Sequence, residues 1–313
     1  MADKFLRDHK EGETVEGCFF LKGKRTRTAK NGKDYLDLVF EDKSGELGGK
    51  AWDDVPRLQK EVQEGRVVHL KAQVEIYNEK RQLRILALRA AFPDEADLSS
   101  LQPGADEAPE VMWGKVERIV AGEVKNPSFL TLFRKSAELY KARILQAAGA
   151  KKVHHSYAGG WLEHTLGVME TVLSFPSRYG LDRELLVMGA FLHDLGKLEE
   201  MGGETGREET EVGFLLGHTL LGLRMVQDLI AQIPDFGKKK ETALLHLISS
   251  HHGTHEFGAP QLPLTKEALA LHLADYLDSQ VKIFDDIKQK GEGGISSEYD
   301  GRIGRRIYLG NGE

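Results

Sequence analysis

The spacing of apolar residues changes once along this chain, and the change divides it into two folding units. Residues 13–92 alternate apolar and polar positions in short runs, separated by turn signals such as Asn31-Gly32, which is typical of β-strands. From about residue 111 to 290 the apolar residues recur every three to four positions, which predicts helices. The chain is therefore predicted to be multidomain, with an all-β part followed by an all-α part.

Residues 93–110 join the two units. They hold three of the nine prolines and no aromatic residue, and this composition predicts a linker. Residues 291–313 form a tail that contains glycine and arginine. The tail either adds a basic patch near the helical unit or is a disordered or oligomer-forming segment, so a homo-oligomer is one candidate assembly; its arginines are Arg302, Arg305 and Arg306.

The first unit has the element order of an OB-fold. Five strand-like runs, with a polar helical piece at residues 54–64 between the third and the fourth, predict a small all-β OB-fold barrel within residues 1–92. Residues 13–92 carry 16 Lys and Arg against 13 Asp and Glu, whereas the whole chain has a net charge of -6. The barrel is therefore the better partner for a polyanion.

OB-folds hold single strands by stacking bases on aromatic side chains while cationic residues follow the phosphates. Tyr35, beside a basic stretch, is the predicted stacking residue, whereas Phe40 and Trp52 are expected in the barrel core. The predicted nucleic-acid contacts of the basic stretch are Lys24, Arg25, Arg27, Lys30 and Lys33.

Residues 111–290 are predicted to form an all-α helical bundle. Asp182 is expected to cap a helix that reaches His193, and Ser128 to cap one that ends at Gln146. Further helices are expected at residues 161–178, 211–233, 239–252 and 265–290.

Several classes of protein are excluded or disfavoured by the residues that the chain lacks. Cys18 is the only cysteine, so neither an intramolecular disulfide nor a cysteine-based zinc cluster can form. The chain has no run of about 18 apolar residues, which is the length needed to span a membrane. Residues 1–15 lack the apolar stretch of a secretory signal. The chain is expected to be cytoplasmic, and a metal site would have to consist of His, Asp and Glu.

Ten of the twelve histidines fall between residues 154 and 272. His193 and Asp194 end an apolar helix, where burial of both groups is costly unless they pair with each other or bind a cation. A single such residue is more often an ordinary buried histidine or a surface aspartate. Six of them on five successive predicted helices favour a metal centre, and the candidate ligands are His164, His193, Asp194, His218, His251 and Asp275.

A ligand set of His and Asp suits divalent manganese, iron, cobalt, zinc or magnesium. Six ligands with a central Asp194 could hold two ions, which is a usual arrangement for phosphoester hydrolysis. Asp194 and Lys197 are the candidate catalytic residues, with Lys197 neutralising charge on the phosphate. The alternative for Lys197 is a solvated lysine just past a helix end.

The order of these ligands resembles the HD-domain superfamily of metal-dependent phosphohydrolases. Together with the barrel it resembles the YhaM family of 3′-to-5′ exoribonucleases, most specifically over residues 33–38, 48–52, 154–165 and 250–258. The resemblance implies that the six candidate ligands are metal positions, with Asp194 as the bridge. His252, His154 and His155 are candidates for metal or substrate binding.

The resemblance also implies a reaction. The expected function is a metal-dependent 3′-to-5′ exoribonuclease that hydrolyses single-stranded RNA to nucleoside 5′-monophosphates, with single-stranded DNA as a second substrate and two divalent ions, manganese first among them. One alternative is an HD-type phosphohydrolase of a nucleotide or signalling nucleotide, against which the barrel argues. A non-catalytic single-strand-binding protein is disfavoured because all six ligand positions are filled.

Overall fold

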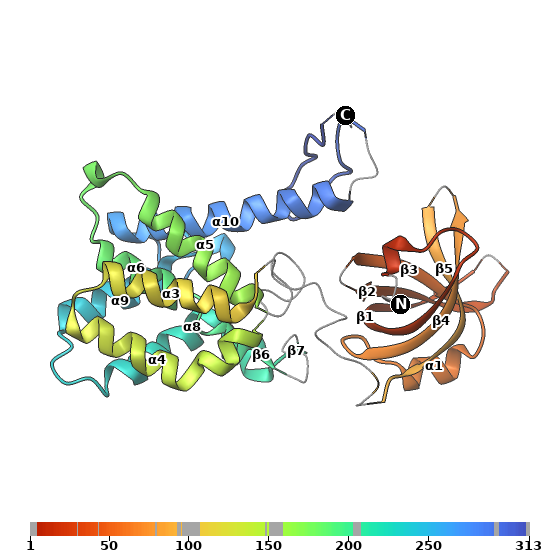
Figure 1. Ribbon diagram of the computed structural model, residues 1–313, viewed down its shortest axis with the longest axis horizontal. Helices are drawn as coiled ribbons and strands as arrows, with labels where there is room; N and C mark the ends of the chain where they lie inside the picture. The colour runs from red at the N-terminus through yellow and green to blue at the C-terminus, as the bar shows by residue number, and fades with distance from the viewer. Residues whose placement is uncertain are drawn as a thin grey trace. The chain divides into compact units, whose positions relative to one another are not determined.

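The computed structural model describes residues 5–29, 31–42, 44–78, 80–92, 95, 107–147, 149, 159–202, 208–290 and 294–310. The chain divides into two compact units, Met1–Gly104 and Ala105–Glu313 (Figure 1). The first unit is a β-barrel and the second is helical. Among the described residues, no helix combines the length and the apolar character needed to cross a membrane.

The first unit is a closed five-stranded barrel, which confirms the predicted OB-fold. Its strands follow one another around the barrel as β1-β2-β3-β5-β4, with β3 and β5 parallel and the other neighbouring strands antiparallel. The elements are η1 (Leu6–Asp8), β1 (Thr14–Thr28), β2 (Asp34–Asp42), β3 (Gly45–Ala51), α1 (Val55–Glu61), β4 (Val67–Tyr77) and β5 (Lys80–Ala90). The helix α1 lies between β3 and β4 in the chain, as the sequence predicts.

The alternation of side chains along the strands produces the barrel core. On β2, Leu36, Leu38 and Phe40 are fully buried, while the residues between them are only partly buried. Gly49 on β3 lies where strands cross closely, since a Cβ atom there would stand 2.9 Å from a methyl carbon of Ile85. Phe40 is therefore a core residue, as expected.

The second unit consists of helices, which confirms the predicted all-α fold class. Two-residue strands, β6 (Met201–Gly202) and β7 (Glu208–Glu209), form a minimal sheet beside them. The helical elements are α3 (Pro109–Glu123), α4 (Pro127–Gln146), α5 (Gly160–Ser174), η2 (Ser177–Tyr179), α6 (Arg183–Leu192), α7 (Lys197–Glu200), α8 (Glu211–Ile230), α9 (Lys238–Ser250), η3 (His255–Phe257) and α10 (Lys266–Lys290).

Helix α6 lies at the centre of this unit, since every residue from Leu185 to Leu192 is buried. Phe191 on α6 contacts aromatic rings from three neighbouring helices, with centroids 5.0 to 6.3 Å apart: Trp113, Phe133 and Trp161. Large aromatic side chains bury much apolar surface, so this cluster fixes the end of α6 from which the His193-Asp194 pair emerges.

Two helix starts were predicted from capping residues, and one of the predictions is wrong. The carboxylate of Asp182 accepts a hydrogen bond from the Leu185 amide at 3.0 Å, as expected. Ser128 does not cap α4; Asn126 does, because its side-chain oxygen accepts from the amides of Ser128 and Phe129. Pro127 then occupies the first helical position, where its missing N–H costs nothing.

The described part of the tail folds back on the end of α10. Ile307 packs with Ile283 and Ile287. The guanidinium of Arg302 lies 3.4 Å from Asp286 on α10 and 2.8 Å from Asp300 in the tail. Residues 294–310 therefore have a defined position on the helical unit.

Candidate metal centre

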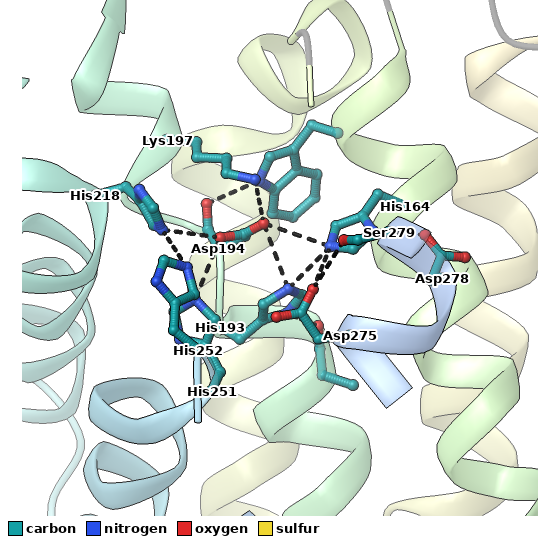
Figure 2. A network of polar contacts seen from close by, with 12 residues as sticks. His164, His193, Asp194, Lys197, His218, His251, His252, Asp275, Asp278 and Ser279 are labelled. Atoms are coloured by element: carbon teal, nitrogen blue, oxygen red, sulfur yellow. Dashed lines mark hydrogen bonds and ion pairs between the residues drawn. The ribbon is translucent and has the colours of Figure 1, made fainter. Parts of the chain in front are cut away.

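Five separate segments of the helical unit bring the six predicted ligands and His252 to one place (Figure 2). His164 lies on α5, the His193-Asp194 pair follows α6, and His218 lies on α8. The remaining three come from the end of α9 and from α10: His251, His252 and Asp275. Their ligand atoms form two groups that could each hold a metal ion, one of Asp194, His218, His251 and His252, the other of His164, His193 and Asp275.

The backbone around Asp194 is held in place by two close contacts. The indole N–H of Trp161 donates to the Asp194 carbonyl oxygen at 2.8 Å. Gly196 lies so close to α8 that a Cβ atom on it would stand 1.9 Å from the carbonyl oxygen of His218. A glycine is therefore required here, and it allows Asp194 and His218 to approach each other.

Helix α8 is interrupted one residue before His218. Gly217 has φ 70° and ψ 156°, a conformation that is open to glycine and strained for other residues. The helix axis changes direction at this point, so the kink sets the direction from which His218 enters the site.

The carboxylate of Asp194 lies between the two groups. Its Oδ2 atom is 3.5 Å from Nε2 of His164 and 3.4 Å from Nε2 of His193. Its Oδ1 atom is 3.5 Å from Nε2 of His218 and 3.7 Å from Nε2 of His251. Each oxygen thus faces a different group, which is the geometry that a bridging carboxylate needs.

The five histidines share one orientation, with Nδ1 facing an acceptor and Nε2 facing the centre. Carbonyl and carboxylate oxygens only accept hydrogen bonds, so Nδ1 carries the proton and the Nε2 lone pair points inward. The acceptors are Asp278 for His164 (2.7 Å), Ala190 for His193 (2.8 Å), Glu200 for His218 (3.3 Å), Ile248 for His251 (2.7 Å) and Phe257 for His252 (2.6 Å).

This arrangement fits divalent metal ions. Asp194 Oδ1 and His251 Nε2 are buried and have no hydrogen-bond partner among the described residues, a costly state that a cation would relieve. The Nε2 atoms of His218 and His252 face each other at 3.1 Å, and those of His164 and His193 at 3.3 Å. Two inward lone pairs at such distances repel unless a proton or a metal ion is shared between them.

The charge states also suit metal ligation. Burial raises the pKa of Asp194, but the charges of Lys197 and His193 outweigh it and hold this pKa well below its usual value. Burial lowers the pKa of His251 far below the ordinary value, and the nearby His252 lowers it further. Asp194 is therefore ionised and His251 neutral near pH 7, which are the forms that coordinate metals.

His164 differs from the other ligands because two carboxylates contact it. Burial lowers its pKa, yet the hydrogen bonds to Asp275 and Asp278 outweigh burial and raise it to about 10. Nε2 of His164 lies 3.2 Å from Asp275. Without a metal, a proton on this nitrogen takes the place that a cation would occupy.

Lys197 points into the site. Its Nζ atom lies 2.6 Å from Oδ2 of Asp194, and its side chain is 14% exposed. The alternative of a solvated lysine is therefore wrong. The two other candidates for metal or substrate binding, His154 and His155, lie outside the described residues.

Two further carboxylates of the site lie behind the ligand histidines; the sequence predicts the first, Asp278, as an outer or surface carboxylate, and it does not predict the second, Glu200. Asp278 follows Asp275 by three residues on α10, and this helical spacing is a signal that the sequence does contain. Glu200 lies at the end of α7, where nothing in the pattern distinguishes it from the neighbouring Glu199. Both contact a ligand histidine from the side away from the centre.

The predicted nucleic-acid contacts of the barrel have several different surroundings. Lys24 donates to the carbonyl oxygens of Gln59 and Val62 at the end of α1, at 2.9 and 2.6 Å. Arg25 lies opposite Asp37 in the strand register, and Arg27 forms an ion pair with Asp37 at 2.8 Å. Lys33 lies 3.3 Å from Asp53, and Lys30 lies outside the described residues.

Trp52 is not in the barrel core, so that prediction is wrong. Strand β3 ends at Ala51, and Trp52 is only partly buried and stacks on Tyr35 with centroids 4.4 Å apart. Nζ of Lys50 lies 5.8 Å from the ring centre of Tyr35 and 4.9 Å from that of Tyr77. We call Tyr35, Lys50, Trp52 and Tyr77 the aromatic platform; Lys50 was not among the predicted nucleic-acid contacts.

A family model agrees with the helical unit. The HD domain family matches residues 161–280, which contain all seven residues of the two groups. Among solved structures, the SSB domain of a Synechococcus sp. protein matches 26% of this chain and 96% of that chain, with 16% identity and a TM-score of 0.22. That similarity is weak, and the OB-fold rests on the strand order of the barrel.

Several relatives that match nearly the whole chain are named as exoribonucleases. The 3'-5' exoribonuclease YhaM of Listeria innocua is 31% identical over 311 residues, covering 98% of both chains. The protein of the same name from Bacillus velezensis is 32% identical, covering 94% of this chain and 93% of the relative. With this identity along nearly its whole length, the chain belongs to the YhaM family of 3′-5′ exoribonucleases.

Proposed function

We propose that this protein is a metal-dependent 3′-to-5′ exoribonuclease that hydrolyses single-stranded RNA to nucleoside 5′-monophosphates, with single-stranded DNA as a second substrate. The observation that carries the proposal is the Asp194 carboxylate, which faces a group of histidines with each oxygen. The family to which the chain belongs supplies the direction of digestion and the product.

The two groups would hold two divalent ions, manganese first among the candidates. His164, His193 and Asp275 would ligate one ion, and His218, His251 and His252 the other, with Asp194 shared by both. Bound there, such ions acidify a water molecule and stabilise the negative charge on the phosphoryl oxygens.

The side chains around the ions have their own tasks. Lys197 holds Oδ2 of Asp194 at 2.6 Å and places a positive charge at the edge of the centre, where it would neutralise the scissile phosphate. The carbonyl and carboxylate acceptors behind the histidines keep each ring in the tautomer that ligates through Nε2.

The barrel would bind the strand that the helical unit digests. Its aromatic platform offers stacking surfaces to bases, and Tyr77 in it is 56% exposed. The side chains of Arg27 and Lys33 are 53% and 55% exposed. Arg27 pairs with Tyr35 in the strand register, and Lys33 contacts Asp53, the residue after Trp52. Single strands are the class of substrate that such surfaces fit, because only unpaired bases can stack on them.

A digestion assay tests the proposal. The purified protein with manganese is expected to shorten a 5′-labelled single-stranded RNA stepwise from its 3′ end and to release nucleoside 5′-monophosphates. The same assay with chelator should show no shortening. An intact oligonucleotide beside a consumed free nucleotide would instead identify a small-molecule phosphohydrolase and overturn the proposal.

A further inference from the structure

The five ligand histidines differ in the group that accepts their Nδ1 proton. For three of them the acceptor is a backbone carbonyl oxygen, on Ala190, Ile248 and Phe257. For His164 and His218 it is a carboxylate, Oδ2 of Asp278 at 2.7 Å and Oε2 of Glu200 at 3.3 Å. Each of the two metal groups contains one of these carboxylate-backed histidines.

A carboxylate behind an imidazole does more than a carbonyl oxygen does. It fixes the ring and the tautomer, and its negative charge increases the electron density on the opposite nitrogen, which raises metal affinity. The group with His218 contains a single carboxylate, Asp194, whose other oxygen faces the second group. The charge of Glu200, whose side chain is 12% exposed, therefore adds to a group of otherwise neutral nitrogen ligands.

Behind His164 the chain makes room for the carboxylate. Gly167 lies three residues after His164 on α5, and a Cβ atom on it would stand 2.3 Å from Oδ1 of Asp278. Glycine inside a helix lowers helix propensity, so its presence here needs a reason. The close approach of Asp278 is such a reason, because any larger residue would push the carboxylate away from His164.

We propose that Asp278 and Glu200 are positioning residues, each of which strengthens the binding of one metal ion through one histidine. Asp278 acts through His164 on one ion, and Glu200 acts through His218 on the other. The inference rests on the proposed two-metal centre and goes beyond it, because it assigns separate outer carboxylates to the two ions.

Manganese binding by the full chain tests this assignment. The wild type is expected to bind two Mn²⁺ ions in calorimetric titration. Asp278→Asn keeps a side-chain oxygen that can accept from Nδ1 but removes the charge, so we expect affinity for one ion to fall about 10- to 100-fold. Glu200→Gln should lower the affinity for one ion to a similar extent, and the double variant should lower the affinity for both ions.

Gly167→Ala tests the same role without altering either carboxylate. The added methyl group should displace Asp278 and lower the affinity for one ion, even though alanine favours the helix. Gly114→Ala on α3 is the matched control, because a Cβ atom there meets nothing within 4 Å. Glu170→Gln controls for charge, since Glu170 and Asp278 line the same cavity of about 320 Å³.

Thermal denaturation of the metal-free variants separates positioning from general stability. We expect manganese affinity to fall in the three positioning variants, even where the metal-free melting temperature equals that of the control. Two tightly bound ions in all three variants, with wild-type affinities, would overturn the inference while leaving the two-metal centre intact. A wild type that binds fewer than two ions, or that leaves RNA undigested, would instead contradict the proposed function.

Discussion

Asp194 is 2% exposed, so its carboxylate is almost completely desolvated. Lys197 and the surrounding imidazoles compensate for this loss by holding its pKa low, so the carboxylate remains charged. A charged group kept inside a protein core at this cost is typical of a functional site.

Asp194→Ala should reduce RNA hydrolysis by at least about 100-fold, because both groups lose the carboxylate that faces them. Binding of a single-stranded oligonucleotide should remain, since the barrel is a separate compact unit. Product gels and fluorescence anisotropy measure the two properties on one preparation. Hydrolysis at the wild-type rate would remove Asp194 from the mechanism.

The metal-free protein should lose stability as the pH rises above neutrality. His164 has a pKa of about 10 in the fold against an ordinary 6.5, so its protonated form stabilises the fold fully below about pH 6.5. This contribution is lost as the pH approaches 10. Melting temperatures in chelator should therefore fall more steeply from pH 7 to 10 for the wild type than for His164→Gln; parallel curves would contradict the assignment.

For helix α8 the sequence predicted the span of the element but not its internal break. The helical period predicted residues 211–233, and α8 spans Glu211–Ile230. The kink at Gly217 was not predicted, because apolar residues continue on both sides of it and hide the interruption. Capping shows the same limit, since Asp182 stands alone before its helix, whereas Asn126 and Ser128 compete as caps only two residues apart.

The site could be predicted to a similar extent. Six ligands follow from polar residues placed within apolar helices, one or two to a helix, and the structure brings these six together. Glu200 could not be found in this way, because its role depends on how α7 packs against α8. Trp52 was misplaced because an aromatic residue at a strand end serves the core or a surface stack equally well.

Gly217→Ala should destabilise α8 and disturb one metal group. The φ of 70° with ψ of 156° is strained for alanine, at a cost of about 1–3 kcal/mol in the free energy of unfolding. Apart from the adjoining backbone, the described residues place no atom within 4 Å of the added Cβ, so the effect would come from the backbone conformation. Gly122→Ala on α3 is the control; equal melting temperatures and equal manganese binding for the two variants would contradict this role of the kink.

For the whole molecule, the proposed function assigns recognition to one unit and chemistry to the other. The basic barrel carries the aromatic platform, and the acidic helical unit carries the metal groups. Because each unit has its own hydrophobic core, a change on the platform should leave the metal groups intact. Variants of the two units should therefore affect different kinetic parameters.

Tyr35→Ala should weaken binding of single-stranded RNA by about 1–3 kcal/mol, the usual contribution of a base stacked on an aromatic ring. Turnover of a substrate too short to reach the barrel should not change. Tyr179→Ala, which removes an exposed tyrosine of the helical unit, is the control. Anisotropy titrations measure the binding, and loss of turnover on the short substrate would contradict a role restricted to binding.

Trp161 gives the helical unit an optical reporter of its own. Its ring is fully buried, and its indole N–H is bonded to the backbone of Asp194, so a divalent charge arriving at that residue changes the electric field across the ring. The emission of this tryptophan should shift when manganese binds, and the shift should be absent in Trp161→Phe. Loading of the centre could then be followed in real time, without an attached dye and without turnover.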